Sequence, residues 1–353
     1  MNKNISSLEK DQLFSLDLFF KNQFKGNYRY GTMGSFFWKI FTNPFGKGFV
    51  KAIHHEDNIV AITSITPKSL FIKQVEYTAA EIGDTYTDRK FQGRGFFSLL
   101  VNESRKVAND SGIKFIYGTP NNQSMPGYLK NAGFNIVDEF KISTYRFELR
   151  VDHILRSKIG GFSASLINFL FEILIRVFNF LIGIFYPSSR VYKIEIINSL
   201  DENWDIFWKK ASREWDVIFN RDYKSLNWRF FSNPDIYTFL VVRESERIVG
   251  YCIYRIMPDI LGNRLVIADF LFLKGHLKAF NNCLKTIKKS SFELNINSIT
   301  LWCDSGSIYH KILVKNGFFS HNKVPLICYM NDFYNKFKGI KNVHFTMSDS
   351  DNV

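Results

Sequence analysis

Two different spacings of hydrophobic positions alternate along the chain, and together they predict an α+β fold. Short segments in which apolar and polar residues alternate are typical of strands, and several occur in each half. Between them, residues 97–109 carry apolar side chains at helical spacing, with Phe97 and Leu100 on one face. A strand at 113–118 and a short helix at 124–131 are predicted to follow. Each half is therefore expected to hold a sheet flanked by helices.

The chain also repeats itself. The motif W-[KR]-x-F-[ST]-N-P begins at Trp38 and again at Trp228. Three further matches follow in the same order and at a nearly constant offset: Ile59-Val60-Ala61 with Ile248-Val249-Gly250, Ile82-Gly83-Asp84 with Ile267-Ala268-Asp269, and Gly133-Phe134 with Gly317-Phe318. Ordered matches of this kind are typical of a tandem duplication.

The length of 353 residues suits two domains of about 150 residues each. We expect a first domain at residues 1–150 and a second at 191–340. An apolar helical linker at 151–190 joins them, and a C-terminal tail occupies 341–353.

A loop with two glycines joins a strand to a helix in the first half. Residues 85–97 read TYTDRKFQGRGFF, so Gly93 and Gly95 precede the predicted helix. Glycines at a helix start leave backbone N–H groups accessible, and the helix dipole adds partial positive charge there. This arrangement indicates a site for a pyrophosphate group.

The same loop resembles the cofactor site of the GNAT N-acetyltransferase superfamily. Gln92-x-x-Gly95 is similar to the family signature [QR]-x-x-G-x-[GA], and Asn122 with Gly133-Phe134 is similar to its later N…G-F element. The resemblance implies two tandem GNAT-like domains, each with a mixed, mostly antiparallel sheet flanked by helices. It implies acetyl-CoA as the acyl donor and the following binding residues: Gln92, Gly93, Arg94, Gly95, Phe96 and Phe97 for the pyrophosphate, Thr85, Tyr86 and Thr87 for the pantetheine arm, and Asn122 in support.

Two positions depart from the family pattern. Phe97 stands where the signature has Gly or Ala, so contact there must come from the backbone. The Tyr that the family often uses as general acid falls at Leu129, one residue after Tyr128. Because one residue is a rotation of about 100° on a helix, both catalysis and packing remain open for Tyr128. In the second half the loop reads Leu273-Lys274-Gly275-His276, and we expect that copy not to bind coenzyme A.

Acyl transfer to an amine requires a group that accepts a proton from the nitrogen. Glu81 and Asp84 lie on the strand that leads into the loop, and strict alternation would place them on opposite faces. Asp84 has a counterpart, Asp269, in the half that lacks the loop, which favours a structural role. We therefore expect Glu81 to be the base, with a solvated or salt-bridged Glu as the alternative.

The net charge and the spacing of the cysteines limit which binding partners and metals we expect. The net charge of +13 suits a phosphate-rich donor, a nucleotide-linked substrate or an anionic membrane. No Lys/Arg-rich arm or zinc-finger pattern is present, so we expect no nucleic acid partner. The four cysteines are irregularly spaced and His54-His55-Glu56-Asp57 is typical of a solvated hairpin, so we expect no metal. The N-terminus lacks an apolar signal segment, which predicts a cytoplasmic protein, with the inner membrane face as the alternative.

Residues 162–186 are the most apolar in the chain and predict one long helix. Their polar or small positions recur at spacings of three and four and form one stripe: Ser165, Asn168, Glu172, Arg176, Asn179 and Gly183. Burial between the domains, a position in the interface of an anionic membrane and a full span all fit this pattern. We expect burial.

The function that follows from the resemblance is acyl-CoA-dependent N-acyl transfer to a small-molecule primary amine, an amino sugar of bacterial polysaccharide synthesis being our first choice. An aminoacyl-tRNA-dependent transferase of the peptidoglycan-bridge type and a non-catalytic, membrane-associated binding protein are the alternatives. The sequence does not specify the oligomeric state.

Overall fold

The computed structural model describes residues 5–24, 33–259, 262–329 and 332–351. The chain forms two compact units, each assembled from three segments: Met1–Phe140, Asp216–Asp235 and Pro325–Lys341 in the first, and Lys141–Trp215, Ile236–Val324 and Asn342–Val353 in the second. The predicted domains at 1–150 and 191–340 were continuous. The units differ from them because short segments of each half belong to the other unit.

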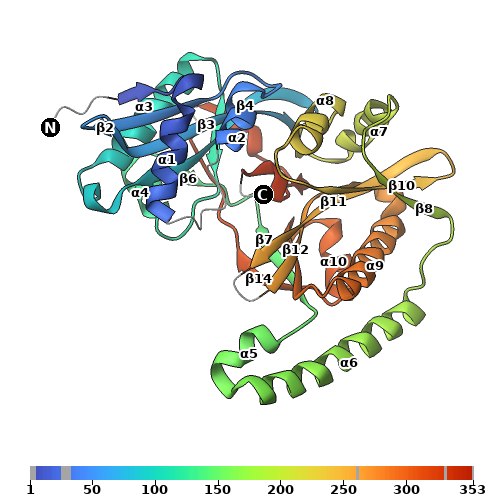
Figure 1. Ribbon diagram of the computed structural model, residues 1–353. Helices are drawn as coiled ribbons and strands as arrows, with labels where there is room; N and C mark the ends of the chain where they lie inside the picture. The colour runs from blue at the N-terminus through green and yellow to red at the C-terminus, as the bar shows by residue number, and fades with distance from the viewer. Residues whose placement is uncertain (1–4, 25–32, 260–261, 330–331, 352–353) are drawn as a thin grey trace. The chain divides into compact units, whose positions relative to one another are not determined.

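The first unit contains the following helices and strands (Figure 1): β1 Ile5–Ser7, α1 Leu13–Phe24, α2 Met33–Phe36, β2 Phe49–His55, β3 Asn58–Ile72, β4 Val75–Thr87, α3 Phe96–Asp110, β5 Phe115–Gly118, α4 Met125–Asn131, β6 Asn135–Ile136, β9 Val217–Phe219, α8 Tyr223–Leu226 and β15 Ile327–Tyr329. Its sheet runs in the order β1-β2-β3-β4-β5-β15-β6, and β9 pairs with the far end of β3. Only the β4–β5 pair is parallel among these neighbours.

The second unit contains a corresponding set: β7 Ile142–Glu148, α5 Asp152–Ile159, α6 Gly161–Phe185, β8 Tyr192–Ile197, α7 Trp204–Ala211, β10 Thr238–Glu244, β11 Arg247–Asp259, β12 Gly262–Phe272, α9 Leu277–Glu293, β13 Ser298–Asp304, α10 Ile308–Lys315, β14 Phe319–Lys323 and β16 Val343–His344. Its sheet runs β14-β7-β13-β12-β11-β10-β8, and only β12–β13 is parallel.

Each strand of the second sheet has a counterpart in the first. The central parallel pair β12–β13 corresponds to β4–β5, and each pair is followed by an antiparallel strand from a distant part of the chain. In the first sheet that strand is β15, which lies between β5 and β6. In the second it is β7, which lies between β13 and β14. The mixed, mostly antiparallel α+β architecture is therefore confirmed in both units.

Helix α3 covers the first sheet and contributes to its core. The observed helix begins at Phe96 and ends at Asp110, close to the predicted 97–109. Its buried positions are Phe96, Leu100, Val101, Ser104 and Ala108, which recur at the helical spacing that the sequence shows. Val101 and Ala108 share one buried cluster with residues of β4, β5 and α4, so this packing fixes the helix that follows the glycine loop.

The two copies of the repeated motif lie together in the first unit. Each forms a five-residue π-helix, Phe37–Phe41 and Asn227–Phe231. The indole rings of Trp38 and Trp228 stack with centroids 4.7 Å apart and an interplanar angle of 17°. The indole N–H of Trp38 donates to the carbonyl of Trp228 at 2.9 Å, and that of Trp228 donates to the carbonyl of Trp38 at 3.4 Å. The motif therefore makes a symmetric contact with its own repeat.

Trp38→Phe should lower the free energy of unfolding by roughly 1–2 kcal/mol, because it removes the 2.9 Å hydrogen bond and leaves the buried carbonyl of Trp228 unsatisfied. Urea titration would measure the loss. The same substitution at Trp228 should act on the same contact, so the two effects should not add in the double variant. Additive effects would contradict the paired arrangement.

Helix α6 is mostly exposed, which makes the expected burial of residues 162–186 wrong. Only 11% of its most apolar 18-residue window is buried, and it is the one described helix that is long and apolar enough to cross a membrane by length and composition. Figure 1 shows it as one continuous helix after α5. Its buried positions are Ala164, Asn168 and Ile182.

Candidate active site

The site is built where β4 and β5 stop pairing. The parallel ladder between these strands includes Ala79, Ala80 and Glu81, and β4 then continues to Thr87. On the side away from β3, the main chain of residues 82–87 therefore has no ladder partner within this described segment. Main-chain N–H and C=O groups that lack a ladder partner are suited to hydrogen-bond an extended ligand.

A β-bulge interrupts β4 directly before the loop. Asp84 and Thr85 together face one residue of β3, Thr63, and Asp84 has a positive φ of 47°. The Thr85 hydroxyl lies 2.7 Å from the Thr63 hydroxyl. The bulge changes the direction in which β4 side chains point. Strict alternation therefore fails here, and the predicted placement of Glu81 and Asp84 on opposite faces does not follow.

The glycine loop leaves β4 through a short 3₁₀ turn at Arg89–Phe91. The Asp88 carboxylate accepts from the backbone N–H of Lys90 at 2.8 Å, and the Gln92 amide donates to the Thr87 carbonyl at 3.1 Å. The Gln92 side chain therefore connects the glycine loop to the end of β4.

The backbone conformation favours glycine at positions 93 and 95, and the space above both residues is open. Their φ angles are 77° and 78°, in the left-handed region that disfavours side chains with a Cβ. A Cβ at either position would meet nothing within 4 Å. Gly95 is also the N-cap of α3 and supplies no side chain to the first N–H groups, and the first turn of α3 carries no acidic residue. An accessible helix N-terminus without a competing carboxylate fits a pyrophosphate group.

Phe97, the departure from the family signature, points into the protein. Its ring makes an edge-to-face contact with Tyr128, with centroids 4.9 Å apart. A Cβ on Gly127 would lie 2.6 Å from the same ring, so the absence of a side chain at 127 makes room for Phe97. Sequence reasoning did not find this compensation, although a glycine inside a predicted helix is the signal that could have shown it.

Tyr128 is buried on α4, and its hydroxyl reaches the bulge. It lies 2.7 Å from the Thr85 hydroxyl, and the residue is 4% exposed. Burial raises the pKa of Tyr128 far above its ordinary value, and the charges of Asp84 and Glu81 raise it further, against the lowering effect of the Thr85 hydrogen bond. The phenol therefore stays protonated near neutral pH. A protonated phenol at this position carries a proton that it can donate, and its ring packs against Phe97.

Glu81 is buried at the last paired position of β4. It is 3% exposed, and its Oε2 lies 3.7 Å from the ammonium group of Lys68 on β3. The sequence left a solvated or a salt-bridged Glu81 as the alternative to a base; the side chain is buried rather than solvated, and the sequence did not identify Lys68 as its partner. Glu81 lies on β4 shortly before the bulge, and its charge contributes to the raised pKa of Tyr128.

Two side chains contact the carboxylate of Asp84. Its Oδ2 accepts from the Ser64 hydroxyl at 2.5 Å and also forms an ion pair with Lys39. Lys39 is the second residue of the repeated motif, so Asp84 links the bulge to the π-helix at Phe37–Phe41. These contacts are consistent with the structural role that the sequence predicts for Asp84.

Three comparisons with known proteins bear on this geometry. Residues 18–137 match the family model of the acetyltransferase (GNAT) domain. Residues 18–137 are a GNAT domain. The predicted resemblance to the GNAT superfamily is thereby confirmed for this segment, which carries a GNAT-type acetyltransferase domain. No curated protein sequence matches the chain.

Solved structures with the same fold cover almost the whole chain. A conserved protein from Enterococcus faecalis, named a probable N-acyltransferase, is 14% identical with a TM-score of 0.63, over 96% of this chain and 74% of that one. The N-myristoyltransferase of Saccharomyces cerevisiae with bound myristoyl-CoA is 12% identical with a TM-score of 0.62, over 93% and 83%. A GCN5-related N-acetyltransferase from Anabaena variabilis is 11% identical with a TM-score of 0.61, over 93% and 73%. At these identities the likeness shows the fold alone.

In the second unit, side chains of that unit occupy the position that corresponds to the open loop of the GNAT domain. The hydroxyl of Tyr309 accepts from the backbone N–H of Phe272 at 2.8 Å and donates to its carbonyl at 3.0 Å, at the end of β12. The backbone N–H of Lys274, in the loop that follows, donates to the Glu214 carboxylate at 2.7 Å. Side chains of the unit itself therefore satisfy the strand end and the loop that correspond to β4 and Gln92–Gly95, which supports the expectation that this copy does not bind coenzyme A.

Two other predicted positions are on the surface. Asn122 is exposed in the turn before α4, where Asn121 accepts from the backbone N–H groups of Gln123 and Ser124. His54 and His55 end β2, and Glu56 and Asp57 form the turn to β3 with φ angles of 48° and 62°. That turn is the solvated hairpin the sequence predicts.

Proposed function

We propose that the protein is an acetyl-CoA-dependent N-acyltransferase that transfers the acyl group directly to a primary amine in a ternary complex. The observation that carries this proposal is the open glycine loop at the uncapped N-terminus of α3, beside the unpaired end of β4. The residues that would hold acetyl-CoA are the main chain of Gly93–Phe97 and of Thr85–Thr87, and Asn122 would support it from the surface.

Two proton transfers accompany the reaction, and we assign one side chain to each of them. The amine nitrogen attacks the thioester carbonyl, a C–N bond forms and the C–S bond breaks. The proton lost from nitrogen passes to Glu81, directly or through water, and the thiolate leaving group takes a proton from the Tyr128 hydroxyl, which regains it from Glu81 through water as the products leave. Tyr128 still holds its proton when the thiolate forms, and we prefer Glu81 as the base because Asp84 has a counterpart, Asp269, in the half that lacks the loop.

The acceptor class we propose is an amino sugar, free or nucleotide-linked. The net charge of +13 suits the phosphate groups of a nucleotide-linked sugar. We place the protein in the cytoplasm, where acetyl-CoA and nucleotide sugars are both available.

Initial-rate kinetics with acetyl-CoA and a panel of amino sugars test the proposal. We expect release of free thiol only when an amine is present, and reciprocal plots that intersect, as a ternary complex requires. Parallel plots would indicate a covalent acyl-enzyme instead. Stimulation by aminoacyl-tRNA in place of acetyl-CoA would support a peptidoglycan-bridge type of transferase.

A non-catalytic acyl-CoA-binding protein is the second candidate. The burial of Glu81 against Lys68 favours it, because a base engaged in a buried ion pair is less accessible to an incoming amine. Binding of acetyl-CoA without transfer to any amine of the panel, and without turnover of longer acyl-CoA donors, would favour this candidate over the enzyme.

A further inference from the structure

Helix α6 has its polar and apolar faces in an unusual orientation. In most surface helices the polar face meets water and the apolar face meets the core. The polar stripe of α6 instead contacts the second unit, to which α6 belongs. The apolar side carries the exposed residues: Phe162, Leu166, Ile167, Phe169, Leu170, Ile173, Leu174, Val177, Phe180, Leu181, Ile184 and Phe185.

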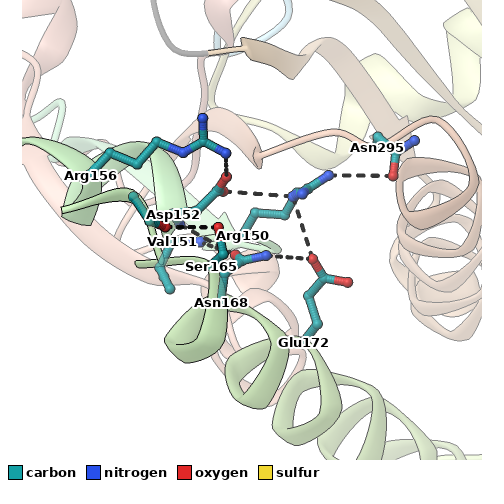
Figure 2. Close-up of polar contacts among 9 residues, drawn as sticks. Arg150, Val151, Asp152, Arg156, Ser165, Asn168, Glu172 and Asn295 are labelled. Carbon is teal, nitrogen blue, oxygen red and sulfur yellow. Dashed lines mark hydrogen bonds and ion pairs between the residues drawn. The ribbon is translucent and has the colours of Figure 1, made fainter. Parts of the chain in front are cut away.

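The first half of the polar stripe is tied to the segment before α6 (Figure 2). Asn168 is 5% exposed, and its Oδ1 accepts from the backbone N–H groups of Val151 and Asp152 at 2.8 and 3.3 Å. Its amide donates to Glu172 at 2.7 Å, and Glu172 lies 3.4 Å from the guanidinium of Arg150. Arg150 in turn donates to Asn295 at 3.4 Å, beyond the end of α9.

The second half of the stripe is tied to α9. The ammonium of Lys288 donates to the side chain of Asn179 at 3.0 Å, and the guanidinium of Arg176 lies 4.8 Å from the ring centroid of Phe292. Both charged residues in the middle of α6, Glu172 and Arg176, therefore have partners within the second unit. A span would break these contacts and place both charges in hydrocarbon, which is strongly unfavourable.

The apolar face is broad rather than narrow. At about 100° per residue, the exposed apolar side chains cover roughly half of the helix circumference. A partner helix needs only a narrow seam of apolar positions. An arc of this width along a helix of 25 residues, with no charged side chain on it, suits a continuous apolar medium.

Cations lie at both ends of this face. Arg156 and Lys158 are exposed in the last turn of α5, directly before α6. At the other end Arg190 is exposed, the ammonium of Lys315 lies 5.3 Å from the ring centroid of Tyr186, and Lys285 donates to the Tyr186 carbonyl. Positive charge at both ends of an apolar helix complements a layer of anionic lipid headgroups.

We propose that α6 docks the protein on an anionic bilayer surface, with the helix lying in the interface and its polar stripe fastened to the second unit. Phe169, Leu174 and Phe180 enter the acyl region, and the cations at the two ends contact the headgroups. The enzyme would then act at the membrane surface without crossing it. This inference does not depend on the proposed acyl transfer.

Sedimentation of the full chain, purified without detergent, with vesicles tests the proposal. We expect binding to phosphatidylcholine vesicles that contain phosphatidylglycerol and roughly tenfold weaker binding at high salt. Phe169→Ser with Phe180→Ser should weaken binding by about 100-fold, because each ring loses an apolar environment. Acetyl-CoA affinity and melting temperature should not change, since these rings are 61% and 69% exposed.

A matched control replaces apolar residues of similar exposure elsewhere in the second unit. Ile196 and Ile206 are 67% and 70% exposed on β8 and α7, and their replacement by Ser should leave vesicle binding unchanged. Equal loss in the control and in the α6 variant would overturn the proposal. So would a wild-type protein that stays in the supernatant, or a wild-type dimer that the α6 variant converts to a monomer without any effect of vesicles.

A fluorescent label reports the depth of α6 on an otherwise unchanged helix. All four native cysteines are buried, so Leu174→Cys supplies one accessible thiol for an environment-sensitive dye. Anionic vesicles should shift its emission to the blue, whereas the same dye at Ile206→Cys should not respond. An unchanged spectrum at position 174, or protein that alkaline carbonate fails to release from the vesicles, would contradict interfacial docking.

Discussion

Glu81→Gln is expected to reduce kcat by about 100-fold and to leave the dissociation constant of acetyl-CoA unchanged. The reason is that glutamine keeps the shape of the side chain and cannot accept a proton from the attacking amine. Glu81 lies at the end of the β4–β5 ladder, and its charge acts on the Tyr128 hydroxyl. Steady-state kinetics and acetyl-CoA titration of the same preparation would separate the two parameters.

The ion pair with Lys68 requires a second variant. Glu81→Gln leaves the Lys68 ammonium, which is itself buried, beside a neutral side chain, so some stability is lost. Replacing Lys68 by Met in the same chain removes that charge. If Glu81 is the base, Lys68→Met with Glu81→Gln should fold more stably than Glu81→Gln and remain equally slow. Recovery of activity in the double variant would show that Glu81 serves only the ion pair.

Asp84→Asn provides the comparison at the neighbouring carboxylate. Because Asp84 contacts Lys39 and Ser64, its neutralisation should lower the melting temperature more than it lowers kcat. A large loss of kcat in Asp84→Asn, together with near-normal turnover in Glu81→Gln, would assign the base to Asp84.

Local signals in the sequence predicted the loop and its helix well. The helical spacing of apolar residues and the two glycines gave α3 to within one residue at each end. The left-handed conformation of Gly93 and Gly95 is a property of these residues themselves, so no long-range information was needed.

The exchange of β7 and β15 between the two sheets could not be predicted. Both are short strands with ordinary apolar composition, and their partners lie far away in sequence. Strand pairing depends on contacts between distant residues, and nothing within residues 142–148 specifies which of two similar sheets they join. The predicted domain boundary at residue 150 followed the repeat and therefore kept β7 with the first half.

For a related reason, the sequence could not predict which face of α6 meets the protein. The spacing of Asn168, Glu172 and Asn179 identified a polar stripe, and periodicity shows that two faces differ. It does not show which face meets the protein. The partners Arg150 and Lys288 decide this, and neither contact has a sequence signal.

Because of the β-bulge at Asp84 and Thr85, the candidate site differs from the one that the sequence predicts. Alternation along a regular strand placed Glu81 and Asp84 on opposite faces, but two residues of β4 face one residue of β3 at this point. Both carboxylates therefore influence the Tyr128 hydroxyl. The same region that binds the acyl donor in our account thus carries the candidate acid and base together.

Calorimetric titration of Gly95→Asp and Gly112→Asp with acetyl-CoA tests the central claim most directly. The two glycines lie at opposite ends of α3, have φ angles of 78° and 81°, and a Cβ at either would meet nothing within 4 Å. Asp tolerates this backbone conformation at both positions, so the variants differ mainly in where the carboxylate lies. We expect Gly95→Asp to bind acetyl-CoA about 100-fold more weakly than wild type, because its charge opposes the pyrophosphate at the helix N-terminus, and Gly112→Asp to bind normally. Equal affinities in the two variants, or no binding to the wild-type protein, would contradict the claim that this loop holds the acyl donor.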